Sequence, residues 1–213
     1  MDKKYKLAEK KFFPELNKEL WQIEAVANFG NVKKGARGGW IEKEDNLSQD
    51  GEAWVSGEAW VSGDAWVYGD AWVSGNARVS GNAWVSGNAW VSGNARVYGN
   101  AWVYGNAWVS GNARVSGNAW VYGNAWVYGN ARVYGSNEIL VLGKLGNSGR
   151  FITCTPDKSH KMQISCGCFL GGIDAFEKAV REKYGDDPNS DYMLIMPLLR
   201  KKEAEWAKGK EEL

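Results

Sequence analysis

The sequence predicts a mainly β protein, a triangular parallel β-helix with an N-terminal β cap and a small α+β C-terminal domain. Three observations indicate it: a glycine at every sixth position from Gly51 to Gly135, an alternation of side-chain type between those glycines, and a second period of three hexads. The segment from Gly51 to Tyr134 consists of consecutive hexads of the form G-[E/D/N]-A-[W/R]-V-[S/Y], without insertion. Such fixed-period self-similarity is typical of repeat architectures.

The alternation within each hexad predicts which side chains face inward. Ala and Val are separated by one residue, and so are the Trp or Arg position and the Ser or Tyr position. Strand side chains alternate between two faces, so one of these pairs must point inward. Arg replaces Trp in four hexads, and a narrow core cannot hold four charges without acidic partners. We therefore expect Ala and Val inside and the tryptophans outside.

The longer period predicts a coil with three sides of one hexad each, because the four arginines are three hexads apart. Equivalent residues of successive coils then lie above one another in three columns. The first column carries Trp54, Trp72, Trp90, Trp108 and Trp126, the second Trp66, Trp84, Trp102 and Trp120, and the third Trp60, Arg78, Arg96, Arg114 and Arg132.

The hexad resembles the hexapeptide repeat of left-handed β-helix proteins, which place an aliphatic residue, here Val, and a small residue, here Ala, four positions later. The left hand is implied by this resemblance, since the spacing gives three sides and no handedness. Many such proteins are trimeric acyltransferases that act on acyl-CoA or acyl-carrier substrates and use a histidine as general base. The only histidine, His160, follows the repeat. We therefore expect a non-enzymatic protein, with an acyltransferase-like enzyme as the alternative.

A second resemblance covers nearly the whole chain. The motif Gly38-Gly39-Trp40-Ile41-Glu42, the hexads and the later Ser165-Cys166-Gly167-Cys168-Phe169 resemble small proteins of phages and prophages. This resemblance implies a binding role in the host cytoplasm, such as an inhibitor or adaptor that docks on a host protein. It assigns no functional residues.

Composition narrows the range of partners. Lys and Arg total 26 against 25 for Asp and Glu, a net charge of +1, which argues against a general polyanion binder and leaves nucleic acid as a third alternative. Three cysteines and no apolar leader predict reduced thiols in a cytoplasm. No apolar run approaches the length that a membrane-spanning helix needs, so we expect no membrane span.

We expect the N-terminal cap over residues 1–45, the β-helix over 46–145 and the C-terminal domain over 146–213. A strand is predicted near Leu20–Val26, and Leu47 falls in the inward Ala register of a first coil. Ile139 and Leu145 fall in the Val position, which predicts a last coil through Leu145. Gly146–Gly149 then reads as a linker.

The C-terminal domain is predicted to contain two strands and two helices. The strands cover 151–155 and 162–166, joined by a turn at 156–158, and the helices cover 173–184 and 191–208. Pro197 is expected to kink or restart the second helix. The apolar side of that helix is predicted to comprise Met193, Leu194, Leu198 and Trp206.

Four residues of this domain form a candidate zinc set: Cys154, His160, Cys166 and Cys168. Three thiolates and an imidazole suit zinc, but Cys-x-Cys is not the spacing that structural zinc sites normally use. We therefore expect structural thiols, with no metal and no cofactor.

The expected binding surface is the outside of the β-helix. Its arginine column suits an acidic protein surface, and Trp and Tyr are enriched at binding hot spots. The tyrosines that follow an arginine at the next outward position are expected to pack beside the guanidiniums. The alternative is that a second copy of the chain buries this surface in a homo-oligomer. The candidate residues are Arg78, Arg96, Arg114, Arg132, Trp84, Trp102, Trp120, Trp90, Trp108, Trp126, Tyr98 and Tyr134.

Overall fold

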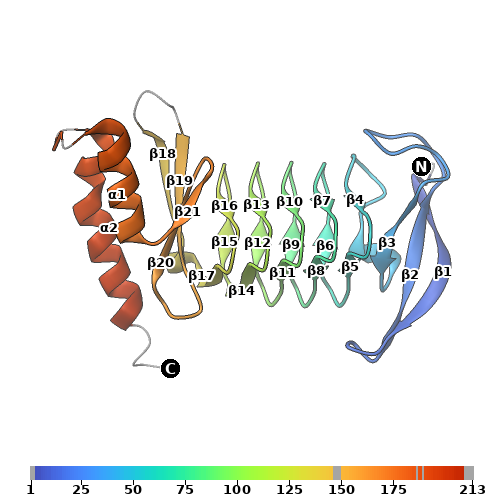
Figure 1. Cartoon of the computed structure of the whole chain (residues 1–213). Coiled ribbons are helices and arrows are strands. Elements are labelled where there is room, and N and C mark those ends of the chain that lie inside the picture. Colours follow the sequence, from blue (N-terminus) through green and yellow to red (C-terminus); the bar gives the residue numbers. More distant parts are fainter. Residues whose placement is uncertain (1–2, 146–149, 186, 189, 209–213) are drawn as a thin grey trace.

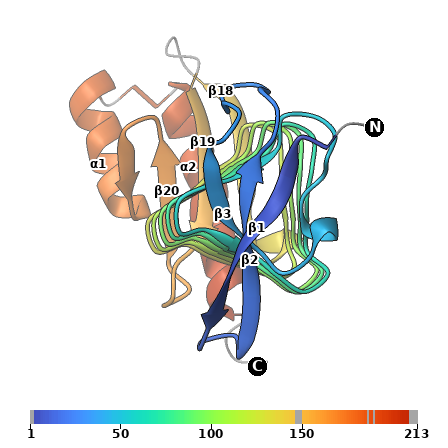
Figure 2. The ribbon, with the colours of Figure 1, turned by 90° about the vertical axis from the view of Figure 1, so that its right-hand side faces the viewer.

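The computed structural model describes residues 3–145, 150–185, 187–188 and 190–208. An N-terminal β hairpin stands at one end, a stack of coils follows, and a sheet with two helices closes the other end (Figure 1). Seen along the stack, the coils superimpose on one another behind the hairpin (Figure 2). The predicted fold class, a mainly β protein with a parallel solenoid of about five coils, is confirmed.

The N-terminal cap is antiparallel. Strand β1 (Tyr5–Phe13) pairs with β2 (Lys18–Ala25), and β2 pairs with β3 (Arg37–Ile41). Strand β3 then pairs in parallel with β5, so Trp40 lies beside Trp60 and Ile41 beside Val61. The cap therefore continues directly into one face of the solenoid.

Short strands, most of them of a single Trp-Val or Arg-Val pair, form the sides of the coils. They are β4 (Trp54–Val55), β5 (Trp60–Val61), β6 (Trp66–Val67), β7 (Trp72–Val73), β8 (Arg78–Val79), β9 (Trp84–Val85), β10 (Trp90–Val91), β11 (Arg96–Val97), β12 (Trp102–Val103), β13 (Trp108–Val109), β14 (Arg114–Asn118), β15 (Trp120–Val121), β16 (Trp126–Val127) and β17 (Arg132–Gly135).

Each predicted column is one parallel sheet. The sheet orders are β4-β7-β10-β13-β16, β6-β9-β12-β15 and β5-β8-β11-β14-β17, and in each of them the paired residues are three hexads apart. Every hexad Ala and Val is at most 1% exposed. Ala and Val therefore fill the interior, and the Trp or Arg side chains project outward.

The corners depend on glycine. The repeat glycines from Gly51 to Gly129 have φ between 61° and 73°, a region that other residues rarely adopt. A Cβ added at Gly87 would also lie 3.0 Å from the backbone nitrogen of Gly105 in the next coil. Beside the glycines, asparagine side chains bond along the axis, with Asn76 donating to Asn94 and Asn94 to Asn112 at 3.3 Å each.

The first coil differs from the expected register. Leu47 pairs with Val67, so it occupies the inward Val position and not the Ala position. The following coils repeat every three hexads, as Trp54 beside Trp72 shows. The chain between Leu47 and Trp54 is longer than the regular repeat requires. The extra length moves Leu47 from the Ala position to the Val position, and both of these positions face inward.

Two repeat tryptophans are buried, contrary to the prediction that all face solvent. Trp54 is 2% exposed because Tyr5 and Phe29 of the cap pack edge-on against its ring. Trp60 is 5% exposed and packs in a cluster with residues of β1, β2 and β3. Both still point out of the coil interior, and the cap covers them from outside.

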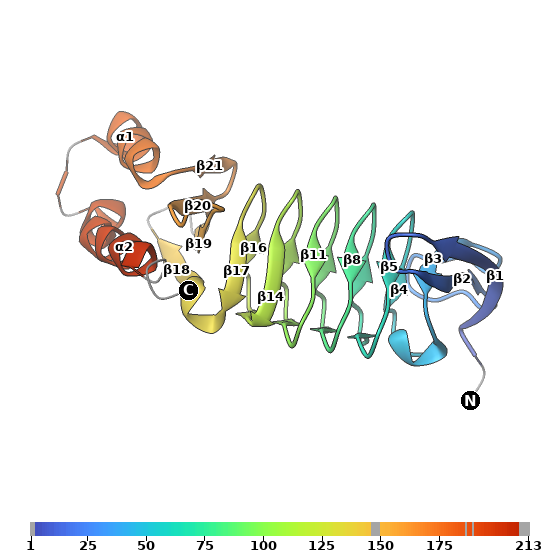
Figure 3. The ribbon, with the colours of Figure 1, turned by 90° about the horizontal axis from the view of Figure 1, so that it is seen from below.

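The C-terminal part combines an antiparallel sheet with two helices. The sheet contains β18 (Leu140–Leu145), β19 (Arg150–Pro156), β20 (Met162–Cys166) and β21 (Phe169–Gly171). The helices are α1 (Ile173–Tyr184) and α2 (Asp191–Lys208), which lie on the side of the sheet away from the coils (Figure 3). The predicted strands and helices of this part are confirmed.

The expected last coil through Leu145 is wrong. After β17 the chain forms a short 3₁₀ turn, Ser136–Glu138, and Leu140–Leu145 pairs antiparallel with β19. Ile139 still packs against the solenoid core, as its Val position predicts. The expected linker, Gly146–Gly149, lies outside the described residues.

Helix α2 buries only part of the predicted side. Trp206 is buried and Met193 packs against the C-terminal core, as predicted, whereas Leu194 is 60% and Leu198 is 46% exposed. The other buried residues of the helix are Tyr192, Met196 and Leu199. The helix also continues through Pro197. In the described part of the chain, neither helix is long and apolar enough to cross a membrane.

Side chains of the C-terminal sheet close one edge of the last coil. Trp126 donates its backbone N–H to Thr153 Oγ1 at 3.0 Å, and Ser165 Oγ donates to the Trp126 carbonyl at 2.9 Å. Tyr128 Oη donates to the Phe169 carbonyl at 3.1 Å. The first two bonds satisfy the Trp126 backbone groups, which an exposed strand edge would leave unpaired.

Candidate interaction surface

The four predicted arginines form one ladder on the third face. Arg78, Arg96, Arg114 and Arg132 pair in register along β8, β11, β14 and β17. Neighbouring strands of a sheet are about 4.8 Å apart, so each guanidinium has another one coil away. We call this row the arginine ladder.

Only the first arginine of the ladder has partners among the described residues. Arg78 Nη2 lies 3.6 Å from Glu15 Oε1, and the guanidinium stands 5.4 Å from the Trp60 ring centre. Both partners belong to the N-terminal end of the molecule. Within the described ranges, the other arginines make neither a hydrogen bond nor an ion pair: Arg96, Arg114 and Arg132.

The middle of the ladder is electrostatically unfavourable to positive charge. Burial lowers the pKa of Arg96, and the positive charges of Arg78 and Arg114 lower it further. The guanidinium still stays protonated at neutral pH, because an arginine pKa lies far above that range. The arginines of the ladder are therefore like charges that destabilise one another's protonated form.

The tyrosines expected to pack on the guanidiniums make no cation–π contact with them in the described part of the chain. Within the part of the chain that the structure describes, no ring contact joins Tyr98 or Tyr134 to an arginine, and Trp60 supplies the cation–π contact of the ladder. Tyr98 is half-buried, and its only effect on Arg96 is electrostatic. Tyr134 is 45% exposed at the end of the last coil. That part of the prediction is wrong.

The second face carries an indole stack. The ring centres of Trp84 and Trp102 are 5.0 Å apart with 6° between the planes, and Trp102 and Trp120 are 5.4 Å apart with 10°. Tyr104 and Tyr122 stack beside them at 5.5 Å. Because each ring covers its neighbour's face, the stack presents mainly ring edges to solvent.

The first face carries a less regular indole row. Trp90 meets Trp108 at 71°, whereas Trp108 and Trp126 lie within 12° of parallel at 5.3 Å. Near its start, the indole N–H groups of Trp72 and Trp90 donate to Ser56 and Ser74 at 3.1 Å each. The outer tryptophans of both faces are 37–45% exposed: Trp66, Trp90, Trp102, Trp108, Trp120 and Trp126.

The four zinc candidates do not form a metal site. Cys154 and Cys166 are buried in the C-terminal core, Cys168 is exposed, and His160 lies in the turn between β19 and β20 with φ 59°. Among the described residues, no three His, Cys, Asp or Glu side chains are grouped as metal ligands would be. Burial raises the pKa of the Cys154 thiol to about 12, so it is a thiol and not a thiolate at neutral pH.

Sequence reasoning missed two features of the surface. Leu194 and Leu198 were assigned to the buried side of α2, yet they are exposed at the far end of the molecule. Glu15, which neutralises Arg78, lies outside any strand, between β1 and β2, and carries no repeat signal. Apolar residues occur on two sides of α2, and the sequence pattern does not show which of these sides packs against the sheet.

Comparison with known proteins supports the architecture. Six segments of the solenoid match the repeat family described as YdcK beta solenoid repeat: residues 71–87, 77–93, 89–105, 95–111, 107–123 and 125–137. The chain is a repeat β-helix protein. A search among curated proteins finds no match.

The ladders of this repeat β-helix protein are chemically suited to recognition. Guanidiniums bind carboxylates with directional hydrogen bonds, and indoles and phenols supply contact area.

Proposed function

We propose that the chain is a non-enzymatic binding protein whose solenoid docks on a partner protein through the arginine ladder and the indole rows beside it. One observation carries the proposal: Arg96, Arg114 and Arg132 form an uncompensated row on a regular β face. Unit charges about 4.8 Å apart repel by roughly 0.9 kcal/mol in water. An acidic surface placed against the row would relieve that repulsion.

The neighbouring faces support the same role. Contiguous exposed apolar surface marks interaction sites, and Trp, Tyr and Arg are the residues most enriched at binding hot spots. The exposed indoles lie on both sides of the arginine ladder, on the first and second faces. A partner that covers the ladder and extends onto one of the adjacent faces would contact both the arginines and the indoles.

The resemblance to phage and prophage proteins supports a host protein as the partner, and an inhibitor or adaptor in the host cytoplasm as the role. The net charge of +1 favours a local acidic patch over a polyanion, because little long-range field remains to attract one. A partner with a row of carboxylates along one face fits this surface.

The test compares two variants with the same change in charge. Arg96→Glu/Arg114→Glu reverses the middle of the ladder, and Lys158→Glu/Lys161→Glu reverses two exposed lysines in the turn between β19 and β20. Each variant is first shown to fold by circular dichroism, then used to capture protein from host lysate beside the parent chain. We expect the first variant to lose the protein that the parent and the second variant retain.

Two results would contradict the proposal. Equal capture by both variants would mean that the ladder is not the docking surface. Thioester-dependent acyl transfer by the purified chain would instead favour the acyltransferase alternative that the hexapeptide resemblance implies.

A further inference from the structure

A cavity of about 540 Å³ opens at the N-terminal end of the second face. Its walls include the Trp66 and Trp84 rings, the acidic residues Glu44, Asp45 and Asp64, and one lysine, Lys43. It lies on a different face from the arginine ladder, since Trp66 and Trp84 belong to the sheet of β6 and β9. The proposed docking function assigns no role to the cavity itself or to its acidic wall, although Trp84 also belongs to the indole stack.

The aromatic walls are set at a right angle. Trp66 and Trp84 meet at 89° with ring centres 5.8 Å apart, whereas the later indoles of this face are nearly parallel. Tyr68 stacks on one face of Trp66 at 4.1 Å and does not line the cavity. The other face of the Trp66 ring is therefore the one that borders the cavity.

The acidic wall has one carboxylate without an ion-pair partner. Glu44 pairs with Lys3 at 2.7 Å, and Asp64 pairs with Lys43 at 2.6 Å. Asp45, in contrast, makes neither a hydrogen bond nor an ion pair with any described residue. Lys43, which also lines the cavity, is engaged by Asp64: the hydrogen bond to Asp64 raises the pKa of Lys43, and the Asp45 charge raises it further. Asp45 is thus the carboxylate of this wall whose oxygens make no direct bond to a described residue, and it lies in the same cavity as the Trp66 ring.

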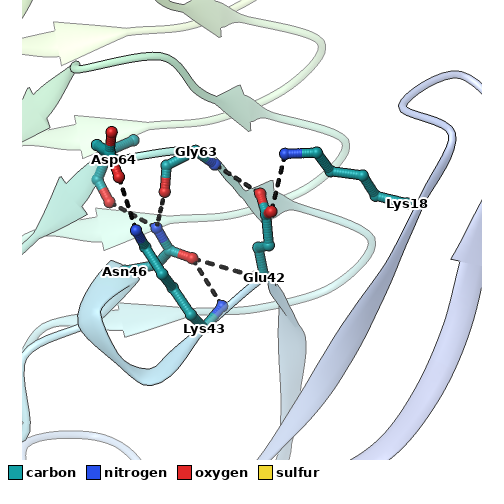
Figure 4. Close-up of polar contacts among 7 residues, drawn as sticks. Lys18, Glu42, Lys43, Asn46, Gly63 and Asp64 are labelled. Carbon is teal, nitrogen blue, oxygen red and sulfur yellow. Dashed lines mark hydrogen bonds and ion pairs between the residues drawn. The ribbon is translucent and has the colours of Figure 1, made fainter.

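Asn46 holds this wall in place. Its side chain accepts the backbone N–H groups of Glu42 and Lys43 and donates to the carbonyls of Gly63 and Ala65 at 3.0 and 2.8 Å (Figure 4). Asn46 is completely buried. The 3₁₀ turn Glu44–Asn46, which carries Asp45, is therefore fixed against the first complete coil before any ligand arrives.

We propose that this cavity binds an organic cation, an ammonium or guanidinium head group, between the uncovered face of the Trp66 ring and the Asp45 carboxylate, with the edge of the Trp84 ring as a further wall. Indole rings attract cations through the negative charge on their faces, and a carboxylate within the same cavity adds a direct charge interaction. A neutral group of equal shape would gain only the apolar contact. The cation could belong to a small free molecule or to a basic side chain of a protein, and the two sources share this chemistry.

The test uses calorimetric titration of the full chain with matched probes. Choline is compared with its uncharged isostere 3,3-dimethylbutan-1-ol, and N-acetylarginine amide with N-acetylcitrulline amide. We expect saturable binding of at least one cation and at least about tenfold weaker binding of its neutral counterpart. Preference for choline indicates a small free cation, and preference for the arginine derivative indicates a protein side chain.

Variants locate the binding. Trp66→Ala and Asp45→Asn are each expected to weaken cation binding about fivefold or more. Trp108→Ala, an indole of the first face, and Glu9→Gln, an exposed carboxylate of β1, serve as controls with unchanged affinity. Asp45 is exposed, so its variant is expected to fold even if Trp66→Ala does not. Neutral probes that bind as well as cations, no saturable binding, or an unaffected Asp45→Asn would each overturn the proposal.

Discussion

Arg78 Nη2 lies 3.6 Å from Glu15 Oε1, across the junction between the solenoid and the N-terminal hairpin. Trp60 lies under the same guanidinium and is itself covered by the cap. The hairpin therefore neutralises one end of the arginine ladder, and the unpaired part begins at Arg96. The contacts of the cap therefore determine which arginines of the ladder remain available to a partner.

Removing the Glu15 charge tests this relationship. Glu15→Gln is expected to lower the free energy of unfolding by no more than about 1 kcal/mol, because both side chains are partly exposed. It should also add one free positive charge and steepen the salt dependence of binding to an acidic partner. Urea unfolding measures the first effect. A loss well above that limit would mean that the ion pair holds the hairpin on the coils.

The solenoid interior should not tolerate a charge. Val97 is fully buried, so Val97→Asp places a carboxylate where no partner can reach it. We expect a loss above about 4 kcal/mol, seen as unfolded circular dichroism at room temperature. Asn88→Asp adds the same charge at an exposed corner and should stay folded. A folded Val97→Asp chain would contradict the position of Val inside the coil.

The asparagine ladders should contribute modestly to stability. Asn94→Ala removes two side-chain hydrogen bonds, one from Asn76 and one to Asn112. We expect a loss of about 1–2 kcal/mol, because these bonds are exposed to water. Asn88→Ala is the matched control, since Asn88 makes no such bond with the described residues. Equal losses in thermal unfolding would show that the corner itself, and not the ladder, carries the effect.

The buried thiol predicts how stability changes at high pH. Burial raises the pKa of Cys154 from 9.0 to about 12, so the unfolded chain loses this proton first as pH rises. The contribution is complete below pH 9 and is lost progressively toward pH 12. We expect Cys154→Ala to flatten the fall in the unfolding midpoint between about pH 9 and 11, and the exposed Cys168→Ala to leave that slope unchanged.

Other groups titrate in this range, so the slope must be compared between variant and parent. Burial also raises the pKa of Tyr5, which acts in the same direction as Cys154. Burial lowers the pKa of Lys4 to about 8, which makes stability rise with pH between about 8 and 10.5. Both groups are present in each variant. An unchanged slope in Cys154→Ala would show that the thiol is not protected by folding.

The coils could be predicted because local rules determine them. Glycine is required at each corner by its positive φ, and Arg replaces Trp only where the side chain faces water, as at Arg96. The recurrence of Arg every three hexads then places each arginine beside the next. Helix α1 was found for a similar reason, since its apolar stripe agrees with the face it buries.

The features that could not be predicted from the sequence depend on contacts between distant segments of the chain. Trp54 is buried because Tyr5 and Phe29 fold over it, and the hexad that contains Trp54 does not differ from its neighbours. Leu47 changes register because the chain that follows it, before the repeat becomes regular, is longer than the repeat requires. The exposed side of α2, with Leu194, is decided by which face meets the sheet. Of the candidate site, the rows of arginines and indoles were predicted, whereas the tyrosine contacts were not.

The most direct test of the account is oxidative footprinting of the chain alone and bound to its captured partner. The proposal places the partner on the arginine ladder, so we expect protection of Tyr98 and Trp102, which lie along the middle of the solenoid. Leu194 and Leu198, exposed on α2, should keep their reactivity. Protection of the two leucines with Tyr98 and Trp102 unchanged would mean that the C-terminal helices bind the partner and that the solenoid only separates the two ends.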